Sequence, residues 1–120
     1  MPELKEGQVI KLIRGFIVKW IELLKLQNWS IDVNYMKGHG EMIDGNFRTH
    51  AVCSSTWHHM TARIQFWPKD LRDESESYIE YVVVHELLHI VVNEMRDKGI
   101  NHEERVVSHL AKAVLGINNA

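Results

Sequence analysis

The sequence is poor in cysteine, in net charge and in long apolar runs, and each shortage excludes a class of protein. Its 120 residues include one cysteine, Cys53, so no disulfide can form within the chain and a reducing, cytoplasmic location is predicted. The formal net charge of -2 provides no general attraction for nucleic acid, which usually binds a basic face. Repeats, low-complexity tracts and linkers are also absent, so residues 1–120 are predicted to form a single domain.

No membrane association is predicted either. The apolar run of residues 16–26 is interrupted by Lys19, Glu22 and Lys25, which makes it too short and too charged to cross a bilayer, and no secretory signal is visible. The composition, 45% hydrophobic and 25% charged, is that of an ordinary soluble globular protein. A chain of this length can bury one core without disulfides.

The first half of the chain changes from helical to strand periodicity. Residues 6–26 carry apolar side chains at helical spacing, which predicts an amphipathic N-terminal helix. Residues 29–35 alternate between apolar and polar, and residues 47–54 and 60–67 are two further predicted strands. The stretch 37–46, which contains three glycines, is predicted to be a loop.

The second half is predicted to be helical. Ser77 and Glu80 fit a capping box at the start of a long apolar helix, and a last helix is expected from about residue 102 to 115. The order of elements predicts an α+β domain: an N-terminal helix, a small, mostly antiparallel sheet of about three strands, and two C-terminal helices.

The segment His85-Glu86-Leu87-Leu88-His89 carries the chemistry. Two histidines four residues apart lie one turn above each other on a helix, so both imidazoles can bind one zinc ion. Glu86 borders the same side and can act as a general base toward zinc-activated water. The surrounding residues are apolar on nearly every side of the helix, where polar groups are costly unless paired or bound. A hydrogen-bonded polar cluster without metal is the alternative.

This motif, with its uncharged flanks, resembles that of the zincin superfamily of metallopeptidases. Val92 and Met95 stand where the longer metzincin pattern has glycine and histidine, so that branch is excluded. The pattern is more similar to the gluzincins, in particular to the minimal gluzincins and the phage-type or ImmA-like peptidases. The resemblance implies a zincin-like fold, a Zn²⁺ cofactor and a peptide or protein substrate, hydrolysed with Glu86 as the catalytic base.

A third zinc ligand is expected because catalytic zinc has three protein ligands and a water. The resemblance to gluzincins favours Glu104, since Ser108, Leu110 and Ala111 follow it at the spacing seen in that family. Glu103, His102 and His109 are the alternatives, and Glu104 can instead complete a capping box with Asn101. Glu104 can reach the metal only if the motif helix ends near residues 93–95 and residues 96–101 form a loop.

Two further expectations concern substrate and class. In zincins the strand that corresponds to residues 60–67 lies at a sheet edge and binds substrate, although an internal strand without that role fits the sequence equally well. His58 and His59 are predicted to be surface residues of a turn.

A non-catalytic zinc-binding or protein-binding module is the alternative function, and a zinc hydrolase of small amides is a third. The oligomeric state is left open.

Overall fold

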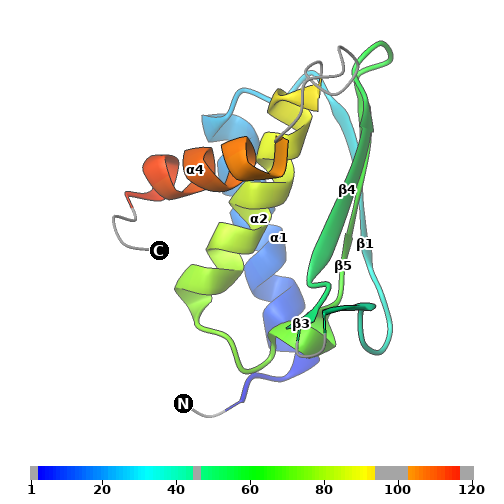
Figure 1. Ribbon diagram of the computed structural model, residues 1–120, viewed down its shortest axis with the longest axis vertical. Helices are drawn as coiled ribbons and strands as arrows, with labels where there is room; N and C mark the ends of the chain where they lie inside the picture. The colour runs from blue at the N-terminus through cyan, green and yellow to red at the C-terminus, as the bar shows by residue number, and fades with distance from the viewer. Residues whose placement is uncertain (1–2, 45–46, 94–102, 117–120) are drawn as a thin grey trace.

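The computed structural model describes residues 3–44, 47–93 and 103–116. Figure 1 shows a helix, a sheet and two further helices in chain order. The helices are α1 (Glu6–Leu23), α2 (Glu76–Val91) and α4 (Glu103–Leu115), with a 3₁₀ helix at Pro68–Leu71. The strands are β1 (Ser30–Tyr35), β2 (Met42–Asp44), β3 (Phe47–Arg48), β4 (Ala51–Thr56) and β5 (Thr61–Phe66). The predicted α+β class and the order of its main elements are confirmed.

The main sheet is mixed, with β5 between β1 and β4. β4 and β5 form an antiparallel hairpin, while β1 pairs with β5 in parallel. The prediction of a mostly antiparallel sheet was therefore wrong for one of these two pairings. A tight turn makes β4 and β5 antiparallel, but the long connection between β1 and β4 allows β1 to add on the far side of β5.

Two other predictions about the strands need correction. The segment of residues 60–67 is central in the sheet, so it is not the edge strand; β4 occupies the edge on the side of α2. The predicted loop at residues 37–46 contains strand β2, which pairs with β3 as a small antiparallel ribbon. Neither feature follows from local periodicity, because β2 is short and strand order depends on contacts between distant segments.

The helices cover one face of the main sheet (Figure 1). In β5, Ala62, Ile64 and Phe66 are buried and alternate with exposed or half-buried residues, as expected for a strand with one covered face. Helix α2 lies among α1, α4 and β4 and is buried on most of its surface. Its buried apolar residues are Ile79, Val82, Val83, Val84, Leu87, Leu88 and Ile90. The motif helix is therefore a core helix, as its apolar sequence predicted.

The start of α2 differs from the prediction. Its N-cap is Ser75, whose hydroxyl accepts a hydrogen bond from the backbone N–H of Tyr78 at 3.1 Å, so the predicted cap at Ser77 was wrong. Glu80 instead connects α2 to α1: its Oε2 accepts from Nε1 of Trp20 at 2.7 Å and from Nζ of Lys19 at 2.8 Å. Burial opposes the ionisation of Glu80, but these contacts outweigh it and hold its pKa below the ordinary value.

We expect Ser75→Ala to lower the free energy of unfolding by about 1 kcal/mol, because it removes a side-chain acceptor from the first turn of α2. Ser77→Ala is the matched control, since Ser77 is an exposed serine two residues further along that does not cap the helix. Urea unfolding of both variants measures the difference. Equal losses of stability in the two variants would contradict the assignment of Ser75 as the cap.

In the described part of the chain, none of the helices combines the length and the apolarity needed to span a bilayer.

Candidate metal centre

Helix α2 places His85 and His89 next to each other. The residues are four apart, and their ring centroids are 5.0 Å apart with an interplanar angle of 71°. Their side chains are 13% and 10% exposed, so both imidazoles lie within the fold and not on its surface. The spacing in the sequence determines this pair, because it is a local property of any α-helix.

Helix α4 adds two adjacent carboxylates to the histidine pair, where it crosses α2 (Figure 1). Nε2 of His85 lies 2.6 Å from Oε1 of Glu104, and Nε2 of His89 lies 3.1 Å from Oε2 of the same side chain. One ligand atom from each of the three residues lies within 4.8 Å of the others. Two imidazole nitrogens and a carboxylate oxygen at this separation can hold a metal ion.

Glu103 contacts the other nitrogen of His89. Its Oε2 accepts a hydrogen bond from Nδ1 of His89 at 2.6 Å. Its side chain is 11% exposed, against 71% for that of Glu104. A carboxylate on Nδ1 orients the ring and selects the tautomer whose Nε2 can bind a metal. The structure thus places Glu103, an alternative ligand in the sequence, behind His89, and places Glu104 in the cluster.

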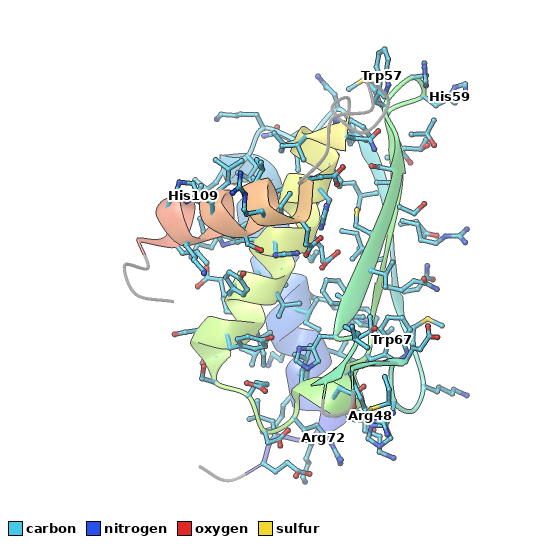
Figure 2. All side chains as sticks on the ribbon, viewed as in Figure 1. Arg48, Trp57, His59, Trp67, Arg72 and His109 are labelled. Atoms are coloured by element: carbon cyan, nitrogen blue, oxygen red, sulfur yellow. The ribbon has the colours of Figure 1, made fainter. Side chains whose placement is uncertain are left out.

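The other candidates for a third ligand are not in the described cluster. His109 is exposed and lies on the part of α4 that is remote from the sheet (Figure 2). His102, Asn101 and the predicted loop at residues 96–101 lie outside the described residues. Helix α2 ends at Val91, slightly before residues 93–95, so it is short enough for Glu104 to reach the histidines.

The electrostatics of His85 suit metal binding. Burial lowers the pKa of His85, although the charge of Glu104 acts in the opposite direction. The imidazole is therefore neutral at pH 7, which is the form that coordinates metals. Its Nδ1 is buried and has no hydrogen-bond partner within the part of the chain that the structure describes. Glu104 on Nε2 is therefore the group that orients this ring, in contrast to His89, which is held from both sides.

Glu86 is 7% exposed and lines the same pocket as His85. Burial, with the negative charge of Glu104 as a second cause, raises the pKa of Glu86 to about 8. Such a carboxyl group exchanges protons near neutral pH, as a general acid–base group must. A cation in the neighbouring cluster would favour its ionised form, so the electrostatics of Glu86 also fit a metal site.

A row of rings leads from the cluster to His50, a residue that belongs to no motif of the sequence. Nδ1 of His50 lies 3.0 Å from the hydroxyl oxygen of Tyr78. Centroid distances are 5.6 Å from His50 to Tyr78, 6.0 Å from Tyr78 to Tyr81 and 5.8 Å from Tyr81 to His85. The helical spacing of Tyr78, Tyr81 and His85 was the available signal, because these positions share one helix face.

The histidines of the β4–β5 turn lie outside the cluster. His58 and His59 are exposed, and His58 stacks on Trp57 with ring centroids 4.3 Å apart, so the predicted surface turn is confirmed. His39 is bound to Asp70 with Nδ1 and Oδ1 2.5 Å apart, at the other end of the sheet.

Comparisons with protein-family models, with curated proteins and with solved structures give no match for this chain.

Proposed function

We propose that the protein is a zinc-dependent peptidase of the gluzincin type, with His85, His89 and Glu104 as ligands and Glu86 as general base. The observation that carries the proposal is the convergence of Glu104, from a different helix, on both histidines. Three protein ligands are typical of catalytic zinc, which keeps a further position for water or substrate.

The donor set favours zinc over magnesium or calcium. Both of those ions prefer oxygen ligands, whereas two of the three groups here are imidazoles. The neutral state of His85 and the orientation of His89 by Glu103 make both nitrogens available. Zinc is the metal that such a set of ligands most often holds in hydrolases.

The residues have distinct roles in amide hydrolysis. When bound, zinc supplies a Lewis acid that polarises the carbonyl and lowers the pKa of water. Glu86 takes one proton from the attacking water, whose oxygen forms the new bond to the carbonyl carbon. The C–N bond then breaks, and Glu86 delivers the proton to the leaving nitrogen. Burial raises the pKa of Glu86 in the metal-free protein, and a bound cation would favour the ionised form, which is the form that accepts the proton.

The position of β4 supports an extended peptide or protein segment as the substrate. β4 lies at the edge of the three-stranded sheet and packs against α2, the helix that carries the cluster. A peptide that adds to a sheet edge is held through its main chain, largely independently of its sequence. We therefore assign the substrate-binding role to β4 and not to β5, where the sequence had suggested it.

The proposal predicts about one zinc ion per chain in protein purified without a metal-chelating tag, measured by elemental analysis. Removal of zinc with a chelator should abolish hydrolysis of casein or of a randomised peptide mixture, and added zinc should restore it. His85→Ala should lose the metal, because it removes one of three protein ligands.

His109→Ala is the control for this experiment, since His109 is an exposed histidine of α4 outside the cluster. It should retain zinc and activity. Failure to bind zinc after reconstitution would refute the proposal. Zinc binding without hydrolysis of any peptide would favour the non-catalytic zinc-binding module instead.

A further inference from the structure

A pocket of about 180 Å³ lies directly beside His85 and Glu86. Tyr78 and Tyr81 of α2 form one wall, and Arg48 and His50 contribute to the opposite side. Pockets for drug-sized ligands are about 300–1,000 Å³, so this one has room for little more than a single residue of a peptide.

The wall that contains Arg48 and His50 is held in place by hydrogen bonds. Asp70, whose side chain is 6% exposed, accepts from the backbone N–H of Gly40 at 2.6 Å, and Nη1 of Arg48 donates to the carbonyl oxygen of Gly40 at 3.1 Å. A side chain at Gly40 would collide with the carbonyl oxygen of Thr49, at 2.0 Å from an added Cβ. His50 is fixed in turn by Tyr78. This end of the site is therefore built in advance of binding.

The pocket lies at one end of β4. His50, just before β4, contacts Tyr78, while the backbone N–H of Trp57, just after β4, donates to Oδ1 of Asn93 at 3.1 Å. β4 and α2 therefore run in the same direction side by side, and His85 lies about midway between these two contacts. Figure 2 shows the two ends of β4, marked by Trp57 and by Arg48, at opposite ends of the sheet.

Charge decides which end of a peptide this pocket suits. The guanidinium of Arg48 attracts a carboxylate and repels an ammonium group, and His50 beside it can donate a hydrogen bond to a carboxylate, while Glu86 lines the other end of the pocket, next to His85. A guanidinium carries five N–H donors, so the bond to Gly40 leaves others for a ligand. A peptide bound antiparallel to β4 would also direct its C-terminus toward His50, and antiparallel pairing is the more stable arrangement.

The distance along α2 gives the length of the segment beyond the cleaved bond. Tyr78 precedes His85 by about 10 Å along the helix axis, at 1.5 Å per residue. An extended peptide covers about 3.3 Å per residue, so about two or three residues fit between the cluster and the far end of the pocket, where His50 contacts Tyr78.

We propose that this pocket binds the C-terminal residue of the substrate, so that the enzyme releases dipeptides or tripeptides from a free C-terminus. The α-carboxylate faces Arg48 and His50, and an apolar side chain packs on the rings of Tyr78 and Tyr81. The inference rests on the proposed peptidase function and adds its substrate class: peptides with an apolar C-terminal residue and a free carboxylate.

The test uses zinc-loaded protein and two randomised peptide mixtures that end in leucine, one with a free carboxylate and one with a carboxamide. Mass spectrometry of the products should show release of two or three residues from the acid, with kcat/KM about 10- to 100-fold above that for the amide. This is the range expected for loss of a hydrogen bond to a charged group.

Arg48→Gln should reduce this preference about 10-fold or more, while Arg63→Gln should preserve it. Arg63 is a matched control because it lies on the solvent-exposed face of the sheet, near Asp32. Equal cleavage of acid and amide at internal bonds by the unmodified protein would overturn the inference and leave the peptidase function standing. Absence of cleavage in both mixtures would refute the peptidase function and the inference together.

Discussion

Glu86→Gln is expected to lower kcat for peptide hydrolysis about 10²- to 10⁴-fold while zinc stays bound at about one ion per chain. Glutamine has nearly the size of glutamate but cannot accept the proton of the attacking water. Glu86 is not one of the residues that surround the metal position, so its loss removes proton transfer and preserves the ligands. Steady-state kinetics with parallel elemental analysis measure both effects.

Glu80→Gln is the matched control for this experiment. It changes the same residue type on the same helix, but Glu80 contacts Trp20 and Lys19 of α1. We expect it to affect stability and to leave kcat unchanged. A Glu86→Gln variant with full activity would remove Glu86 from the mechanism, and a variant without zinc would show that Glu86 supports the metal site instead.

The same substitution has a pH-dependent effect on the metal-free protein. The pKa of Glu86 is about 8 in the folded chain, above the ordinary value of 4.5 that applies when the chain unfolds. The unfolded state therefore binds fewer protons than the folded state between these values, and the stability of the unmodified protein falls as pH rises through this window. Glu86→Gln should lack this fall. The free energy of unfolding of the variant, relative to that of the unmodified protein, should therefore rise from about pH 4.5 to 8, and this pH-dependent gain should vanish at lower pH.

Glu104→Gln should weaken zinc binding on the order of 1,000-fold, and Glu103→Gln only about 10- to 100-fold. The first variant loses the negative charge of one of the three ligands. This loss removes part of the free energy of zinc binding, which is typically about 10–16 kcal/mol. The second weakens the hydrogen bond that orients His89, and loss of such supporting contacts usually costs about 10- to 100-fold.

These two variants form a matched pair, because the same change is made at adjacent residues of α4. Competition with a fluorescent zinc chelator measures both affinities. A larger loss of zinc affinity for Glu103→Gln than for Glu104→Gln would mean that Glu103 is the ligand and Glu104 the supporting residue. Equal small losses would mean that neither glutamate is a ligand and that the histidines bind the metal with another group.

The features that follow from local geometry were predictable from the sequence. The apolar spacing in residues 6–26 predicted α1, and four-residue spacing was sufficient to pair His85 with His89. Alternation also identified β1 and β5 within a residue or two at each end. In each case the signal lies within one element, where the backbone dihedral angles alone decide which side chains share a face.

The start of α2 shows how a local signal can mislead. Ser75 and Ser77 both precede the apolar run, and Glu80 made Ser77 the better match to a capping box. In the folded chain Glu80 bonds to Trp20 and Lys19, so it is not available to complete that box. A contact with a helix about sixty positions earlier in the chain therefore overrides the local pattern.

The α+β fold, and a buried helix with two adjacent imidazoles and a carboxyl group, could be inferred from the order and spacing of the residues alone. In contrast, the contact of Glu104 with both histidines, the position of Glu103 behind His89 and the position of β4 at the sheet edge are visible only in the folded chain. Adjacent residues of a helix point about 100° apart, so the way α4 crosses α2 selects between the two glutamates. That crossing, like the order of the strands, depends on packing between segments far apart in the chain, which no local pattern of residues encodes.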